Sequence, residues 1–300
     1  MKSSSCVGLA LLAGFSVSVH AQRPPQTGPE NSDGLSSSYA MEFSHSTESA
    51  LNRGNTVLGD FDASWLRASY AANIRTSEAY SWSVGLQWDH ARFGAPAGAP
   101  VPEDIYGLAL RFGSTWQMGE RWSLRSDLRP GLYTDFEDIS GGDFNVPFTV
   151  ALGYDVNPDL QVVFAVNVDF RREFPVVGGP GLIWRFADGW RLSLLVPRPQ
   201  IEFTATESLT LFAGGELRAT AIRVAEDFGT ANGLPILNDD QVTYRELRVG
   251  GGLRWQFYRL FRLTAEGGYA LDRRFEFDRG NLLLNGDGAP FFTVSVAGTY

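Results

Sequence analysis

From residue 38 to the C-terminus, apolar and polar residues alternate along the chain with a period of two. In the segment 79–93 one set of alternate positions is apolar and the other is polar or small: Tyr80, Trp82, Val84, Leu86 and Trp88 against Ser81, Ser83, Gly85, Gln87 and Asp89. Successive side chains of a β-strand point to opposite faces, so this pattern predicts strands. Runs of 12 to 15 residues are longer than the usual strand of about five or six. They reach the roughly 9 to 11 residues that a tilted strand needs to cross a bilayer.

The predicted strands are joined by short turns and by longer connections. The short turns lie at 119–121, 157–159, 187–189, 206–208 and 258–259, and the longer connections at 94–103, 225–240 and 276–288. Short turns at one end of the strands and long loops at the other are typical of membrane barrels. The predicted fold is therefore all-β: a closed, antiparallel, up-and-down transmembrane β-barrel.

Fourteen strands are favoured. They cover 38–45, 57–70, 79–92, 104–117, 122–136, 143–156, 160–173, 180–187, 190–197, 200–205, 208–224, 241–256, 260–275 and 289–300. The ambiguous region is 196–200, which contains two prolines. Proline inside a sheet is normally confined to edges and bulges, so a loop or bulge is favoured there. If the region is an interrupted strand instead, the count falls to twelve.

Periodicity alone fits a secreted or periplasmic β protein as well, but the polar face favours a barrel. It carries both signs of charge close together, and the expected lumen charge network is Arg125, Asp127, Arg129, Asp169, Arg171, Arg262 and Glu266. Arginine and carboxylate side chains that share an enclosed lumen neutralise one another, as the polar interior of a membrane barrel allows.

Aromatic residues near the strand ends also favour a membrane barrel. They are Trp65, Tyr80, Trp88, Trp116, Trp122, Tyr133, Tyr154, Trp184, Trp190, Trp255, Tyr258 and Tyr269. Indole and phenol rings favour the boundary between lipid and water. The chain also ends in a strand whose Phe292, Val294, Val296 and Tyr300 share a face. This ending resembles the C-terminal signal of bacterial outer-membrane proteins, which implies handling by the barrel-assembly machinery.

The first 21 residues are expected to be a secretory signal peptide. Lys2 supplies the positive start, 7–19 is an apolar run too short to span a bilayer, and small residues precede a cut after Ala21. We expect 22–35 to be a flexible periplasmic leader and 36–300 to form one outer-membrane barrel domain. Cys6 is the only cysteine and leaves with the signal, so the mature chain has no disulfide, no thiolate zinc site and no cysteine nucleophile.

The composition excludes other classes. The 300 residues carry 25 Lys+Arg against 34 Asp+Glu, a formal net charge of −9, which argues against nucleic acid as a partner. Beyond residue 20 no apolar run approaches the ~18 residues of a membrane helix. A polytopic helical membrane protein is therefore excluded.

The stretch 129–203 resembles an uncharacterised family of bacterial outer-membrane β-barrel proteins, a domain of unknown function. The matching pieces are 130–136 (PGLYTDF), 174–178 (FPVVG) and 189–199 (GWRLSLLVPRP). The resemblance implies the barrel and the outer-membrane location. It implies no catalytic or binding residues.

Candidate chemistry is sparse. After cleavage only His45 and His90 remain as histidines, both near strand ends that are expected on the outer side. The composition around His45 is similar to that of lipid A deacylases, but Ser46 follows it directly, and neighbouring strand residues point to opposite faces. A base must reach its nucleophile, so no enzyme is predicted and both histidines are interpreted as polar rim residues. Two histidines without a thiol also argue against a tight transition-metal site, and no cofactor is expected.

Three functions stay open at this point. A porin-like channel or small-solute transporter of unknown substrate is preferred, because twelve to fourteen strands can enclose a lumen. A structural or adhesive barrel with a closed lumen and an outer-membrane lipid hydrolase are the alternatives. The expected location is the outer membrane of a Gram-negative bacterium. The expected partners are its lipids and, during assembly, the barrel-assembly machinery and periplasmic chaperones; the oligomeric state is open.

Overall fold

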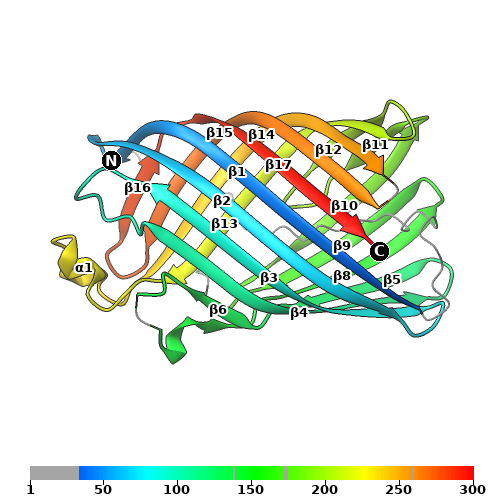
Figure 1. Ribbon diagram of the computed structural model, residues 1–300, viewed down its shortest axis with the longest axis horizontal. Coiled ribbons are helices and arrows are strands. Elements are labelled where there is room, and N and C mark those ends of the chain that lie inside the picture. Colours follow the sequence, from blue (N-terminus) through cyan, green and yellow to red (C-terminus); the bar gives the residue numbers. More distant parts are fainter. Residues whose placement is uncertain (1–33, 138, 172–174, 259) are drawn as a thin grey trace, which may run out of the picture.

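The computed structural model describes residues 34–137, 139–171, 175–258 and 260–300. The expected signal peptide and nearly all of the expected leader, 22–33, lie outside these residues. The described chain is strand almost throughout (Figure 1). None of its helices is long and apolar enough to cross a membrane.

The strands form one closed barrel. Their bounds are β1 Leu35–Arg53, β2 Thr56–Arg75, β3 Tyr80–Gly94, β4 Asp104–Met118, β5 Trp122–Leu128, β6 Gly131–Thr134, β7 Phe144–Asn145, β8 Phe148–Asn157, β9 Leu160–Val168, β10 Val176–Ala187, β11 Trp190–Ser193, β12 Gln200–Thr204, β13 Leu209–Arg223, β14 Gln241–Tyr258, β15 Phe261–Phe277, β16 Leu282–Gly286 and β17 Ala289–Thr299. β5 with β6, β7 with β8 and β16 with β17 each make one strand of the wall, so the seventeen segments form fourteen wall strands. The ladder between β1 and β17, from Ser38↔Thr299 to Ser46↔Phe291, closes the ring.

The count of fourteen and the connection at 196–200 are confirmed. β11 and β12 are two separate strands joined by 194–199, where two prolines interrupt the ladder. Several predicted ends were wrong. β1 and β2 run on to Arg53 and Arg75, beyond the predicted residues 45 and 70, and β10 begins at Val176, before residue 180. β9 stops at Val168, before residue 173, and β11 stops at Ser193, before residue 197. The expected loop 276–288 also holds the end of β15 and all of β16.

The two ends of the barrel differ, and we name them by their connections. The short turns after β2, β4, β8, β10, β12 and β14 lie at one end, the turn end, together with the C-terminus (Figure 1). There the Ser37 backbone N–H donates to the Tyr300 carbonyl over 2.7 Å. The longer connections, the helix α1 (Phe228–Ala231) and the 3-10 turns η1 (Gly141–Asp143) and η2 (Pro235–Leu237) lie at the other end, the loop end.

The apolar face of the strands points outward. Trp82, Leu86 and Phe164 on this face are 36%, 54% and 53% exposed. Val168, on the same face at the end of β9, is 7% exposed. A two-layered sandwich would bury this face, so the exposed face fits contact with lipid. Most of the expected boundary aromatics near the turn end are exposed on it, among them Trp116, Trp122, Trp184, Trp190 and Trp255.

Two of the boundary aromatics were predicted wrongly. Trp65 and Tyr133 are only 8% and 7% exposed and belong to a buried cluster inside the barrel. A period of two assigns residues to one of two faces. It does not tell whether an aromatic ring on the inner face meets water or other apolar side chains.

Candidate functional site

The inward face of the barrel changes character from one end to the other. Along β14 the inward positions run from Val242 and Tyr244 at the loop end, through Glu246 and Arg248, to Gly250 and Gly252 near the turn end. β2 repeats the order with Phe61, Trp65, Arg67 and Asn73. The lumen is therefore built of three levels: apolar, charged, and small or polar.

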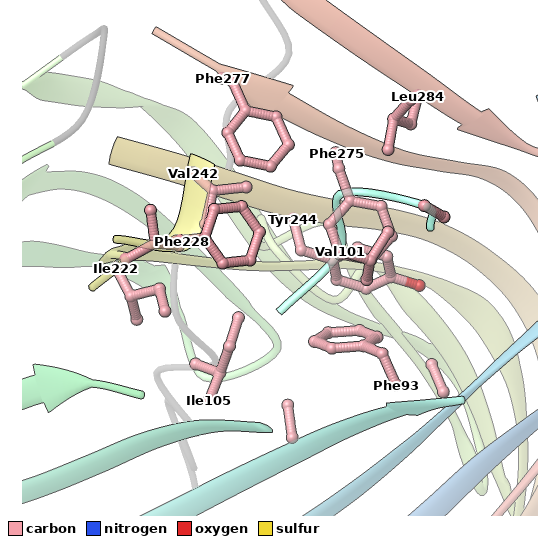
Figure 2. Packing of buried hydrophobic residues seen from close by; sticks show 14 of the residues in the cluster. Phe93, Val101, Ile105, Ile222, Phe228, Val242, Tyr244, Phe275, Phe277 and Leu284 are labelled. Atoms are coloured by element: carbon pink, nitrogen blue, oxygen red, sulfur yellow. The ribbon is translucent and has the colours of Figure 1, made fainter. Parts of the chain in front are cut away.

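The level at the loop end is an outer apolar cluster of buried side chains (Figure 2). The rings of Phe93, Tyr244 and Phe275 meet with centroids 4.7 to 5.0 Å apart. Phe93 belongs to β3, whereas Tyr244 and Phe275 belong to β14 and β15, and β1, β2 and the β16–β17 strand lie between them in the wall. Side chains from distant wall strands thus touch across the barrel, and they fill its bore at this level.

A segment of the loop end covers this cluster. Residues 225–240, which we call the cap segment, contain α1 and η2 and add Phe228 and Leu237 to the cluster. Its two ends are held by carboxylates. Asp135 accepts the Ala225 backbone N–H over 3.0 Å, and Asp240 accepts the Arg279 backbone N–H over 3.0 and 3.1 Å. Burial raises the pKa of the Asp135 carboxyl above its usual range.

The middle level is a central charged layer. Its members are Glu42, Arg67, Arg198, Glu216, Arg218, Glu246, Arg248, Glu266 and Arg273. Arg248 donates to Ser44 over 2.6 Å and to Ser46 and Glu246 over 3.0 Å each. Ser46 in turn donates to Glu246 over 2.7 Å. Arg248, Glu246 and Arg273 are completely withdrawn from solvent.

The other half of the layer joins strands that are not neighbours. Arg218 of β13 donates to Glu42 of β1 over 2.8 Å and contacts Glu216 at 3.3 Å. Glu266 pairs with Arg198 from the connection 194–199. These pairs run across the lumen, so the charged layer closes the bore below the outer apolar cluster. The printed pairs place an opposite charge beside most of these buried charges, which offsets the cost of removing both from water. Arg273 instead donates to the Thr47 carbonyl and the Ser49 hydroxyl and lies over the Phe61 ring.

The level near the turn end is open enough to hold a cavity of about 220 Å³. Cross-strand neighbours Asn73, Ser83, Gly113, Asp127 and Thr149 form one row of its lining. Gly113 makes room, because a Cβ there would lie 2.5 Å from the Ser83 hydroxyl oxygen. Ser81, Thr115, Arg125 and Ala151 form the next row toward the turn end.

The expected lumen charge network is only partly one network. Asp127 contacts Arg129 at 2.8 Å and Arg111 at 2.6 Å, and Arg125 lines the cavity. Glu266 belongs to the central charged layer. Asp169 and Arg171 lie beyond the end of β9, and Asp169 accepts the side-chain amide of Asn145 over 2.7 Å. Arg262 lies on β15 on the side of the strand that carries Glu266.

The sequence prediction missed the strongest part of the charged layer, namely Glu216, Arg218, Glu246 and Arg248. A signal was available. Each Glu–Arg pair occupies alternate positions of one strand, which places both side chains on one face. That face is the inward one, because its neighbours in the alternation, such as Thr220 and Tyr244, are buried.

Neither histidine belongs to the lumen. Both lie on the outward face near the loop end, His45 beside Phe292 and His90 stacked on Tyr106 with centroids 4.4 Å apart. His45 Nδ1 lies 3.0 Å from the Ser64 hydroxyl and 3.9 Å from an Asp62 oxygen. A catalytic triad needs the nucleophile and the carboxylate on opposite ring nitrogens, so this arrangement is no triad. Ser46 points inward, away from His45, as the alternation predicted.

The C-terminal strand carries its expected face outward. Phe292, Val294 and Tyr300 are exposed, and Val296 is half-buried. Within the described residues no group of three His, Cys, Asp or Glu side chains is arranged to hold a metal ion.

The crystal structure of the COG4313 outer membrane channel from Pseudomonas putida F1 is similar with a TM-score of 0.50 and 9% identity, over 92% of this chain and 100% of that one. The P. putida toluene transporter TodX gives a TM-score of 0.42 and 8% identity, over 89% and 90%. No curated protein matches. At such low identity the likeness to the COG4313 channel shows a shared barrel fold.

The family comparison covers most of the barrel. The family described as Domain of unknown function (DUF6268) matches residues 36–284, and the described strands from β1 to most of β16 lie inside this match. The match extends the resemblance that the sequence carries in 129–203. The chain belongs to the DUF6268 family.

Proposed function

We propose that the protein is an outer-membrane channel or transporter for small polar solutes, and that its lumen is closed at the loop end in this conformation. The observation that carries the proposal is the central charged layer inside a wall whose outer face is apolar. The apolar outer face suits lipid and the polar interior suits water. The partners of such a barrel are the outer-membrane lipids and, during its assembly, chaperones and the assembly machinery that would recognise its C-terminal strand.

The charged layer supports a transport role, because packed apolar side chains would stabilise the interior of a barrel at least as well as buried charges do. Replacing buried ion pairs by packed apolar side chains is often neutral or stabilising, and the outer apolar cluster is such a filling. Ionisable side chains inside a membrane protein commonly mark the path of a solute or ion. Opposed arginines and glutamates across a lumen also create a transverse field that orients polar solutes.

Solute passage requires the loop end to open. The cap segment is the part whose movement would uncover the bore. It is held to the barrel through Phe228, Leu237, the two carboxylate contacts at its ends and the ion pairs of Asp239 with Arg223 and Arg279. The ladder beneath it is unbroken from Val242↔Phe277 to Leu247↔Asp272. We therefore assign closure to the cap segment together with the outer apolar cluster.

Conductance in planar bilayers tests the proposal. The wild-type barrel should conduct rarely and in brief openings. A variant lacking 227–238, which also carries Phe93→Ser and Phe275→Ser, should conduct steadily. The matched control is Phe164→Ser, which removes a ring from the lipid-facing side and should leave conductance at the wild-type level. A folded deletion variant, recognised by heat-modifiable migration on gels, that still carries no current would overturn the proposal.

A structural barrel with a closed lumen is the second candidate, because two of the three lumen levels fill the bore. In that case Arg248→Ala would destabilise the barrel and leave the permeability of the opened variant unchanged. If the protein is a channel, the same substitution should also change the ratio of cation to anion permeability.

A further inference from the structure

We propose that the turn-end cavity is a binding site for a small carboxylate that carries several hydroxyl groups, such as a hydroxy acid or sugar acid. This inference rests on the proposed function, because it names the class of solute that the lumen would handle. It concerns a part of the lumen that the closing levels above do not occupy.

The cavity offers several hydroxyl groups to a ligand. Ser81, Ser83 and Thr115 line the cavity on inward positions of β3 and β4, and among the described residues their hydroxyls have no hydrogen-bond partner. Ser114 and Ser126 also line the cavity but occupy the other set of alternate positions, and their hydroxyls bond to each other over 2.8 Å. The inward hydroxyls can both donate and accept. They therefore suit a ligand that presents hydroxyl groups of its own.

The cavity also carries an excess of positive charge. The ionisable side chains of the lining are Arg111, Arg125 and Asp127, a formal excess of one positive charge. Asp127 is already contacted by Arg111 at 2.6 Å and by Arg129 at 2.8 Å, so its negative charge is offset within the wall. The guanidinium of Arg125 interacts with Asp155, whose carboxylate also accepts the Gln161 amide over 2.7 Å. The cavity is thus electropositive, and a planar guanidinium is the side chain best matched to a carboxylate.

The cavity is small. A volume of about 220 Å³ lies below the roughly 300–1,000 Å³ of pockets for drug-sized ligands. It corresponds to about seven waters at ~30 Å³ each. The cavity therefore suits a small metabolite. The hydroxyl and guanidinium groups of the lining also disfavour an unsubstituted hydrocarbon, which would leave them without partners.

Direct binding tests the inference without any flow through the barrel. The folded full-length barrel in detergent micelles is titrated calorimetrically with gluconate, with sorbitol, which lacks the carboxylate, and with hexanoate, which lacks the hydroxyls. Gluconate should bind at least about tenfold more tightly than either, since a charge-assisted hydrogen bond contributes about one factor of ten or more. Equal affinity for all three, or no binding of gluconate, would overturn the inference. Stronger binding of glycerol phosphate than of gluconate would overturn the choice of carboxylate.

Variants locate the site. Arg125→Gln should weaken gluconate about tenfold and leave sorbitol unchanged, while Ser83→Ala combined with Thr115→Val should weaken both. The matched control is Arg121→Gln, four residues earlier in the turn between β4 and β5, which should bind gluconate like the wild type. If Arg121→Gln weakens gluconate as much as Arg125→Gln does, the cavity is not the site.

The two proposals fail in different ways. Gluconate binding in a barrel whose opened variant carries no current would refute the channel and leave the site. A conducting opened variant that binds none of the three ligands would refute the site and leave the channel.

Discussion

The two halves of the lumen are built from the same wall strands, yet their inward side chains differ in kind. Toward the loop end, β14 and β15 send Tyr244 and Phe275 inward, and their rings meet Phe93 from the far wall. Toward the turn end the same two strands send in Gly250, Gly252 and Gly268, and the rings of Phe291 and Phe212 lie against them. The cavity of this half is lined by β2, β3, β4, β5 and β8 instead. The two halves therefore differ in side-chain volume and polarity at inward positions, with the charged layer as the boundary between them.

The largest effect is expected at that boundary. Glu246→Ala leaves the guanidinium of Arg248 buried without its carboxylate, and breaking a buried pair by removing one partner costs about 3–5 kcal/mol. Denaturant unfolding of the barrel in lipid vesicles should show a loss of this size. The double variant Glu246→Leu with Arg248→Met should lose much less, because it removes both charges. An equal loss of unfolding free energy in the single and double variants would mean that packing, and not charge, stabilises the central charged layer.

A somewhat smaller effect is expected within the outer apolar cluster. Leu284 is completely buried there, and truncating a buried leucine to alanine typically costs about 3 kcal/mol through lost burial and the cavity left behind. Leu284→Ala should lower the free energy of unfolding by this amount. Its control is Leu283→Ala on the outward face, where the side chain is 40% exposed and the loss in vesicles should be well under half as large. Similar losses for both would show that the cluster is loosely packed.

The contrast between the halves also marks how far the sequence could predict the structure. Long alternating runs such as 79–93 specify strands, faces and register together, because a slip of one residue would turn every apolar side chain to the wrong face. The fourteen strands and the loop at 196–200 followed from this pattern and from the proline rule. Near the loop end both faces of the strands carry apolar residues, and the pattern there was harder to interpret. Phe61, Phe93 and Phe275 are apolar residues at inward positions, so they interrupt the alternation without indicating what they touch.

The candidate site shows the same limit. Inward placement of Arg125, Asp127 and Glu266 could be predicted from alternation within a strand. Their partners could not, since Glu266 meets Arg198 from a connection far away in sequence and Asp127 meets Arg111 from the neighbouring strand. Pairing across a lumen depends on the curvature and stagger of the closed barrel. A local sequence pattern does not contain these quantities.

A substitution in its lining should make the turn-end cavity smaller. Gly113→Ala adds a methyl group 2.5 Å from the Ser83 hydroxyl, and crowding of this kind costs about 1 kcal/mol when a side chain can shift aside. The barrel should remain folded with a slightly lower free energy of unfolding, and its calorimetric response to gluconate should weaken severalfold. Gly141→Ala, at a position with open space around the added Cβ, serves as the control. If Gly113→Ala binds gluconate like the wild type, the ligand does not occupy the cavity beside β4.

The smallest effect is expected at the loop end, where pH should act on the cap segment. Burial raises the pKa of Asp135 in the folded protein and Asp143 nearby raises it further, and together they outweigh the backbone N–H groups of Glu137 and Ala225, which lower it. A carboxyl whose folded pKa lies above its unfolded value contributes stability below the unfolded pKa, and this contribution is lost as pH rises through the folded pKa. Amide exchange in 225–240, corrected for the intrinsic effect of pH, should therefore indicate looser attachment at pH 7 than at pH 4. Asp135→Asn should remove most of this difference, while Asp278→Asn at the end of β15 should preserve it. A pH response that survives in Asp135→Asn would place the titrating group elsewhere on the cap segment, and the carboxylate contact to Ala225 would then be a consequence of closure and not one of its causes.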